Sequence, residues 1–472
     1  MRGFRRLLFN TSIYGLAPFV PKIASVFTLP FITPFLTSTD YGIIGVLDGY
    51  LALVTVLGSL GLRVVLVNSF YRSRVRYKVV WRQLYAFLTI WGLIYGLFVG
   101  ILIWMILPIE AKENTWSIIF AKVVAATIFN PIILISPLYY QLNQKPKPIF
   151  FVIVISGFLS IGCNILFISH FGWGYMGWIY SILLTSFTSA TLYILLVLVP
   201  QRITPIFNFK WTRIRTSLRV SLPAIPHFYS GILLKNSDKV VLNELNISSK
   251  SIGLYSLAAN FENNFASLAT AIGTGLGPQI REYYKLGRDD LARKLIFIST
   301  AGFLLFCFIC CLWLKEIFIF LIKNDELNQV YPLAIILIMG QVYRPMYYGF
   351  SIRISYEERT NELWKVTLVG AVVNLFLNLT LIPTYGFQIA AITTFTSYII
   401  MGLIGYYKKS FRSYDSQNYF QEVWSLVFIF ATVIVYYAVH LDIYYKTLIT
   451  ILVFSIVIVG FNRFKNEIAK FD

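Results

Sequence analysis

Charged residues are scarce in this chain of 472 residues. Asp, Glu, Lys and Arg together make up only 13% of it, whereas about 25% is usual for a soluble domain. Hydrophobic residues reach 57%, which leaves too few polar side chains to cover the surface of a soluble fold. The composition therefore excludes an ordinary soluble globular protein.

Histidine and cysteine are also scarce, with three and four residues respectively. The histidines do not cluster, and the cysteines all lie inside apolar segments, where a thiol usually behaves as a small hydrophobe. No serine-nucleophile motif, phosphate loop or metal-ligand spacing is found. These absences argue against an enzyme, a metal site and a cofactor, other than a coupling proton or sodium ion.

Long apolar runs dominate the chain, and its mean hydropathy is +0.70. Each run has about 20 residues, enough to cross the hydrocarbon core of a bilayer as a helix. We therefore predict an all-α, polytopic membrane protein with about 14 transmembrane helices. The predicted spans are residues 11–36, 42–70, 83–107, 116–141, 149–169, 175–199, 220–244, 252–279, 295–322, 331–352, 363–382, 388–407, 422–440 and 443–461.

Basic residues alternate between the two sides of this topology. Most of the 40 Lys and Arg residues fall in the N-terminus, in every second loop and in the C-terminus. Positive residues are retained on the cytoplasmic side, so we predict a multi-pass protein of a bacterial inner (plasma) membrane with both termini cytoplasmic. The net charge of +19 then reflects topology, and we expect membrane lipid rather than nucleic acid as a partner. The opposite side holds Lys112, Lys250, Lys323 and Lys446.

The two halves of the chain are related by an internal repeat. Residues 38–42 match residues 250–253 at the start of the equivalent helix. Six helices per repeat is an even number, so the two copies are predicted to be parallel. The predicted domains are an N-terminal six-helix lobe (1–200), a C-terminal six-helix lobe (201–410) and an added helix pair (411–472).

Paired prolines mark the first helix of each repeat, because Pro18 and Pro21 match Pro223 and Pro226. A proline inside a helix removes a backbone hydrogen bond and permits a kink. We predict that these four residues act as hinges that help to open alternate sides of the protein. Tolerated kinks without a function are the alternative.

Six cations lie deep within predicted spans. A charge at the bilayer centre costs about 2.5 to 3.5 kcal/mol, so these side chains are expected to face protein or a water-filled cavity. Each could tie two helices together, but the acidic residues at comparable depth, Asp48, Asp238 and Glu262, are too few to pair them all. We therefore predict that the cations bind an anionic substrate. They are Lys22, Arg63, Lys122, Lys235, Lys239 and Arg344.

The three deep carboxylates have predicted roles of their own. Asp238 stands at i+3 from Lys235 and one residue before Lys239, so all three share one helix face. It can neutralise one lysine and leave the other available. Asp48 and Glu262 lie at matching depths in the second helix of each repeat, where each could bind a coupling proton or sodium ion or simply balance charge.

Residues 237–242 (SDKVVL) and 251–258 (SIGLYSLA) resemble the helix seven to eight signature of the polysaccharide flippases. These belong to the multidrug, oligosaccharidyl-lipid and polysaccharide exporter superfamily. Residues 40–42 and 69–72 are also similar to the family pattern. The family often has an arginine just before the aromatic pair that ends helix two, whereas this chain has Asn68-Ser69 there and an arginine earlier, at Arg63.

The resemblance implies two six-helix lobes that form a V around a central cavity. It also implies that a polyprenyl-diphosphate-linked oligosaccharide, such as an O-antigen unit, moves from the inner to the outer leaflet by alternating access. The six cations would contact the diphosphate, and other polysaccharide-assembly membrane proteins would be partners. The alternatives are a lipid II flippase or multidrug exporter of the same superfamily, or a membrane-bound glycan polymerase or acyltransferase.

Overall fold

The computed structural model describes residues 19–72 and 76–468, and every regular element in those ranges is a helix. Within the described residues, nine helical segments are long and apolar enough to cross a membrane, by length and composition. The prediction of an all-α polytopic membrane protein is thereby confirmed. The count of fourteen spans stays a prediction.

The chain divides into two compact units, which are described separately. Unit 1 is Met1–Leu254 with Leu321–Asn324, and unit 2 is Tyr255–Phe320 with Asp325–Asp472. Helix α12 (Ile225–Glu244) therefore groups with unit 1, although it is the first helix of the second predicted lobe. The predicted domain boundaries stay predictions.

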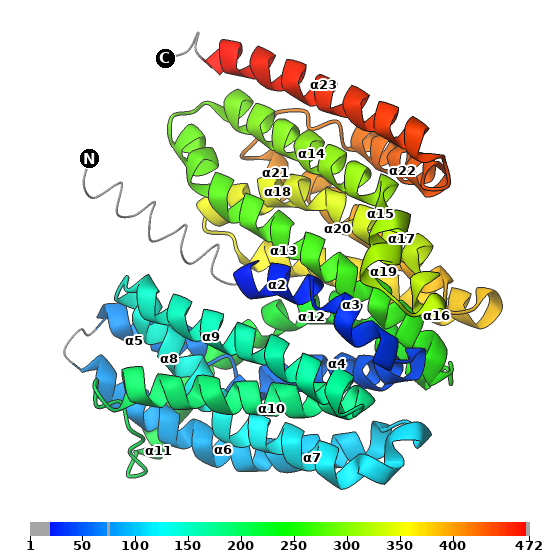
Figure 1. The fold of residues 1–472 in the computed structure, drawn as a ribbon. Coiled ribbons are helices and arrows are strands. Elements are labelled where there is room, and N and C mark those ends of the chain that lie inside the picture. Colours follow the sequence, from blue (N-terminus) through cyan, green and yellow to red (C-terminus); the bar gives the residue numbers. More distant parts are fainter. Residues whose placement is uncertain (1–18, 73–75, 469–472) are drawn as a thin grey trace. The chain divides into compact units, whose positions relative to one another are not determined.

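Unit 1 runs from blue to green in Figure 1. Its elements are α2 (Phe19–Val26), α3 (Leu29–Ile32), η1 (Thr33–Phe35), α4 (Ser38–Ser59), α5 (Arg63–Arg72), α6 (Tyr77–Ile106), η2 (Ile109–Asn114), α7 (Thr115–Val124), η3 (Ala125–Phe129), α8 (Asn130–Leu142), α9 (Pro146–Asn164), η4 (Ile165–His170), α10 (Gly174–Tyr193), η5 (Ile194–Leu198), α11 (Trp211–Ser221), η6 (Leu222–Ala224), α12 and the first turn of α13 (Ser249–Lys285).

Unit 2 holds the rest of α13 and the elements that follow it. They are α14 (Asp289–Leu312), α15 (Leu314–Leu321), α16 (Asp325–Asn328), α17 (Tyr331–Gly340), η7 (Gln341–Tyr343), α18 (Arg344–Tyr356), α19 (Asn361–Tyr385), α20 (Ile389–Ile404), η8 (Gly405–Tyr407), α21 (Lys409–Arg412), α22 (Gln421–Ala438) and α23 (Ile443–Ile468).

The start of α4 is fixed by a capping box. The Thr37 hydroxyl accepts from the Asp40 backbone N–H at 3.2 Å, and the Asp40 carboxylate accepts from the Thr37 N–H at 2.8 Å. The second carboxylate oxygen of Asp40 accepts from the Tyr175 N–H, at 2.9 Å, in the first turn of α10. One carboxylate thus lies at two helix N-termini, where the helix dipoles favour negative charge.

The predicted span 42–70 lies within Ser38–Arg72, which is long and apolar enough to cross a membrane, but a turn divides it into two helices. Leu60 and Gly61 have φ values of 48° and 66°, so α4 ends and α5 begins at Arg63. A Cβ at Gly61 would lie 2.8 Å from the Ser221 carbonyl oxygen, so the chain approaches too closely for a larger residue. Hydropathy does not detect this break, because both flanking helices are apolar.

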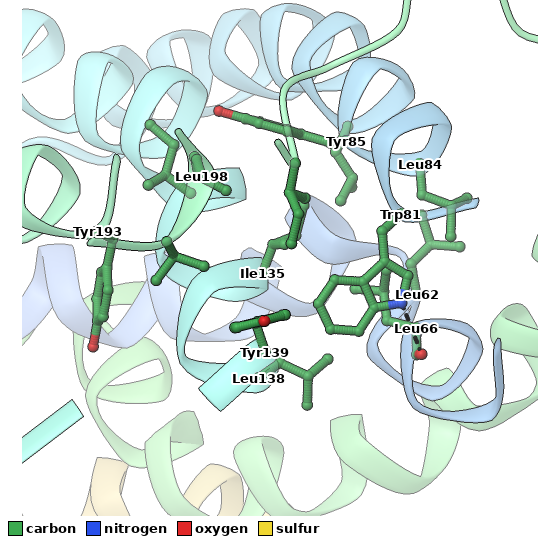
Figure 2. Packing of buried hydrophobic residues seen from close by; sticks show 14 of the residues in the cluster. Leu62, Leu66, Trp81, Leu84, Tyr85, Ile135, Leu138, Tyr139, Tyr193 and Leu198 are labelled. Carbon is green, nitrogen blue, oxygen red and sulfur yellow. Dashed lines mark hydrogen bonds between the residues drawn. The ribbon is translucent and has the colours of Figure 1, made fainter. Parts of the chain in front are cut away.

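Trp81 is at the centre of a core in unit 1. Its ring is fully buried, and its indole N–H donates to the Leu66 carbonyl oxygen at 3.0 Å. Figure 2 shows this bond and the surrounding side chains, which come from the α5 region, α6, α8, α10 and η5. The core holds α5 against α6 directly after the break in the chain.

Three π-helical segments lie in the described part of unit 1: η3 between α7 and α8, η4 at the end of α9 and η5 at the end of α10. The first of them, η3, packs against α6 at Thr127. A Cβ at Gly96 would lie 2.1 Å from the Thr127 methyl carbon, and one at Gly92 would lie 3.1 Å from the Thr127 carbonyl oxygen. Glycines four residues apart thus allow the widened turn to approach α6 closely.

A buried ion pair joins α23 to α15 in unit 2. The Lys446 Nζ lies 2.6 Å from the Glu316 Oε1, and the lysine is 0% exposed. The ammonium also lies 5.9 Å from the centre of the Trp313 ring, and the Trp313 indole N–H donates to Thr450 in the next turn of α23. The first two turns of α23 are therefore anchored by charge as well as by apolar packing.

Candidate functional site

Helix α12 carries three of the predicted charged site residues. Asp238 and Lys239 are buried, whereas Lys235 is exposed, so the shared face is only partly covered. The stem of Lys239 packs on α4, because a Cβ at Gly49 would lie 3.1 Å from the Lys239 Cβ. Because residue 49 is a glycine, the Lys239 side chain can lie directly against α4.

Asp48 precedes that glycine and forms an ion pair with a cation from another helix. The Lys122 Nζ of α7 lies 3.8 Å from the Asp48 Oδ1. The Asp48 side chain is 53% exposed and the Lys122 side chain only 13%, so solvent screens this long contact. One turn of α4 thus contacts Lys122 through Asp48 and Lys239 at Gly49, within unit 1.

Arg63 and Lys22 lie elsewhere in unit 1. Arg63 is the first residue of α5, and its guanidinium donates to the neutral Gln141 side-chain oxygen at 3.2 Å. Lys22 is an exposed residue of α2. Both residues thus belong to helices other than α4, α7 and α12.

The predicted hinge prolines have different surroundings. Pro21 packs on α9, because a Cβ at Gly157 would lie 2.3 Å from its ring. Pro223 lies in the 3₁₀ turn η6 between α11 and α12, and Pro226 lies in the first turn of α12, where proline is tolerated. Pro18 lies outside the described residues. The hinge role stays a prediction.

In unit 2, Glu262 and Arg344 are joined by a residue that the sequence analysis did not identify. Gln341 is 0% exposed, and its amide nitrogen donates to the Glu262 carboxylate at 2.5 Å. Its amide oxygen accepts from the Arg344 Nε. The sequence signal that could have identified Gln341 is its amide side chain, three residues before Arg344 and inside an apolar segment.

Tyrosine rings surround Arg344. Its guanidinium carbon lies 5.8 Å from the centre of the Tyr343 ring, and Tyr343 stacks on Tyr398 of α20 with ring centres 5.2 Å apart. Tyr348 also interacts electrostatically with the arginine. The aromatic faces stabilise a cation without neutralising its charge.

The backbones of the first turns of α4 and α13 are in direct contact. A Cβ at Gly42 would lie 1.8 Å from the Ser249 carbonyl oxygen, and one at Gly253 would lie 1.7 Å from the Ser38 carbonyl oxygen. Each turn thus places its own glycine on the serine carbonyl of the other. The sequence analysis matched these segments as repeat copies but did not predict that they touch.

Replacing Gly42 by alanine is expected to force these turns apart. The new methyl group would meet backbone atoms, which cannot move as a side chain can, and overpacking of this kind costs about 1 to 3 kcal/mol. Thermal unfolding of the purified protein in detergent would measure the loss. Gly162→Ala in α9 is the matched control, because no atom lies within 4 Å of its Cβ position. Equal unfolding temperatures for the two variants would contradict the expectation.

A protein-family model described as "Polysaccharide biosynthesis protein" matches residues 7–283. No curated protein matches the chain in sequence. Among solved structures, the chain is similar to the lipid II flippase MurJ in an inward closed conformation, with a TM-score of 0.63, 15% identity and coverage of 92% of this chain and 99% of that one.

Two further structures share the fold. An inward-facing multidrug resistance MATE family transporter of the MOP superfamily gives a TM-score of 0.57 at 13% identity, covering 86% of this chain and 96% of that one. A MOP superfamily transporter from Pyrococcus furiosus gives 0.52 at 13% identity, covering 84% and 93%. The latter is described as having a binding pocket of reverse polarity that suggests a different function.

Proposed function

Because the chain belongs to the family of polysaccharide biosynthesis proteins and has the fold of MOP superfamily transporters, we propose that it is a flippase rather than an enzyme. Its substrate is a polyprenyl-diphosphate-linked oligosaccharide, which it moves from the inner to the outer leaflet of a bacterial inner membrane by alternating access. The product serves surface polysaccharide assembly, as for an O-antigen, and both termini are cytoplasmic. The diphosphate is bound by Lys22, Arg63, Lys122, Lys235, Lys239 and Arg344.

The observation that carries this proposal is how the two site arginines are held. Arg63 and Arg344 each donate to a neutral glutamine oxygen, Gln141 and Gln341 respectively. A neutral acceptor fixes the guanidinium but leaves its positive charge available to an anion. Arginine suits a diphosphate, because its planar donors match phosphate oxygens in pairs.

Charge also favours this substrate over those of the drug exporters. Pocket polarity is described as reversed in the Pyrococcus furiosus transporter, so polarity can differ between proteins of one fold. Multidrug exporters of the superfamily are expected to prefer cationic compounds, which six cations in the spans would repel. The transporter fold also argues against a glycan polymerase or an acyltransferase, because neither needs alternating access.

Deletion of the protein is expected to leave lipid-linked oligosaccharide units on the inner leaflet. Synthesis of the units continues while their exit is blocked, so they accumulate and surface polysaccharide is lost. Mass spectrometry of extracted lipids would identify the unit, and complementation with the intact gene is the control. Accumulation of lipid II instead would favour the lipid II alternative, and unchanged lipid-linked pools would refute a flippase of either kind.

A further inference from the structure

A pocket of about 770 Å³ lies at the end of unit 1 that carries Lys112, opposite the basic loops of the predicted topology. Three segments form its walls: the end of α6, the turn η2 with the start of α7, and the end of α12 with the turn that follows it. Its volume is in the range of about 300 to 1,000 Å³ that is usual for ligand sites. Its described lining contains none of the six cations of the proposed diphosphate site. The pocket is therefore a separate candidate site.

Two tryptophans line this pocket, and both are mostly exposed. Trp104 of α6 is 67% exposed and Trp116 of α7 is 78% exposed. Tryptophan is common at the ends of membrane spans, so exposure alone does not indicate a ligand. Here the rings line one pocket together with side-chain amides. The electron-rich face of an indole ring attracts the C–H groups that a sugar ring presents on one side, and amides match its hydroxyl groups.

One of these amides belongs to Asn246, which follows α12 and has a φ of 55°. Its N–H donates to the Asn243 carbonyl oxygen at 3.0 Å, and the Ile247 N–H donates to the Leu242 carbonyl oxygen at 3.0 Å. These bonds form the Schellman motif, in which glycine is the usual residue at the left-handed position. Asparagine keeps the turn and adds an amide to the pocket.

The second amide, that of Asn243, is held in place by hydrogen bonds. Its nitrogen donates to the Tyr50 hydroxyl at 3.1 Å, and this hydroxyl donates to the Glu244 carboxylate. An amide has two donor hydrogens and one acceptor oxygen, so the bond to Tyr50 orients the group without using all of them. The η2 wall is also fixed, because the Glu110 carboxylate accepts from the Ser249 hydroxyl at 3.0 Å. The polar side of the pocket is thus preorganised.

Charge around the pocket favours a neutral ligand. Turn η2 carries Lys112 between Glu110 and Glu113, so its negative side chains outnumber its positive one. Glu244 of α12 and Lys250 of α13 add one charge of each sign. This excess of negative charge disfavours a phosphate or an anionic lipid headgroup, whereas the hydroxyl groups of a neutral sugar carry no charge. A sugar therefore fits both the lining and the charge.

We propose that this pocket binds a neutral sugar residue of the substrate's oligosaccharide. The inference rests on the proposed function, in which the end of unit 1 opposite the basic loops faces the outer side of the membrane. The indole faces of Trp104 and Trp116 stack on the sugar ring. The amides of Asn243 and Asn246 bind its hydroxyl groups. The glycan is thus recognised by residues other than those that bind the diphosphate, at the side on which the product is released.

Saturation-transfer NMR tests the site with the purified full-length protein in phosphatidylcholine nanodiscs. The probe is the free oligosaccharide that mild acid releases from the lipid-linked units of the deletion strain, so the diphosphate is absent. We expect magnetisation to pass to the ring protons of at least one sugar, and titration of the probe gives its affinity. Adding phosphatidylglycerol to the nanodiscs should leave this affinity unchanged. Displacement of the probe by that anionic lipid would assign the pocket to a lipid headgroup and overturn the proposal.

Asn246→Gly removes one amide from the pocket without disturbing the turn, since glycine favours the same left-handed conformation. It should weaken probe binding by about two- to tenfold, the usual effect of one lost hydrogen bond. Gln144→Gly is the matched control. Gln144 has a φ of 54° and occupies the same position of a Schellman motif after α8, so this substitution should leave probe binding unchanged.

Two substitutions of Trp116 test the stacking. Trp116→Leu removes the aromatic face and should also weaken probe binding by about two- to tenfold. Trp116→Phe keeps an aromatic face and should retain most of the affinity. Equal affinities for the natural protein, Asn246→Gly and Trp116→Leu would refute the sugar site.

The sugar site and the proposed function fail in different ways. If lipid-linked units accumulate in the deletion strain but the natural protein gives no transfer to the released oligosaccharide, the sugar site is refuted and the flippase stands. If no such units accumulate, the flippase is refuted, and the pocket loses its proposed ligand with it.

Discussion

Replacing Arg344 by alanine is expected to abolish transport while the protein remains inserted in the membrane. The guanidinium donates to a neutral amide and lies beside a tyrosine ring, and in the proposed function its charge attracts the anionic substrate. Loss of one charged partner from a desolvated contact with an anion costs about 2 to 5 kcal/mol, which lowers affinity by about 25-fold or more on the usual scale of about 1.4 kcal/mol per tenfold. Surface polysaccharide and lipid-linked intermediates would report the loss.

Two variants separate charge from geometry in this experiment. Arg344→Lys keeps the charge but lacks the Nε donor to Gln341, so it should retain only part of the activity. Lys365→Ala is the control, because that lysine is 49% exposed and pairs with Glu362. Normal surface polysaccharide in Arg344→Ala, at normal protein abundance, would remove this residue from the substrate site.

Replacing Lys446 by alanine is expected to destabilise unit 2 by about 1 to 3 kcal/mol, because it leaves the Glu316 carboxylate, whose side chain is only 33% exposed, without its partner. The side chain is 0% exposed and contacts Glu316 at 2.6 Å. The loss would appear as a lower unfolding temperature of the purified protein in detergent. The double variant Lys446→Met with Glu316→Leu should recover most of the stability, since it removes both charges and keeps the volume.

Lys409→Ala is the control for the loss of a lysine as such. Lys409 is exposed at the start of α21 in the same unit, so its removal should change stability by less than about 0.5 kcal/mol. If Lys446→Ala behaves like Lys409→Ala, the ion pair to Glu316 contributes nothing to the stability of α23.

Hydropathy predicted the fold class because each span is a local property of about 20 consecutive residues. The capping box of Thr37 and Asp40 is equally local, as it depends on residues three positions apart. Tertiary contacts are not local. Lys446 was placed among the few basic residues opposite the basic loops, and nothing in the sequence indicated that Glu316, 130 residues away, neutralises it.

In the candidate site, too, local features could be predicted from the sequence and tertiary contacts could not. The sequence identified Glu262 and Arg344 by their charge and depth, but a neutral glutamine between them carries no such signal. Gly42 and Gly253 were recognised as copies of one motif, whereas their close approach follows from how α4 and α13 pack. The break at Leu60 and Gly61 was missed because apolar periodicity does not report backbone dihedral angles.

The π-helical segment η3 affects how mutational scans of this chain should be interpreted. It accommodates an extra residue in one turn, and an α-helix rotates by about 100° per residue. A helical wheel drawn from α7 through Ala125–Phe129 into α8 as if the helix were regular would therefore assign the residues of α8 to the wrong side. Residues that face lipid would be scored as facing protein, and tolerance to polar substitution would be misread until the wheel is restarted at Asn130.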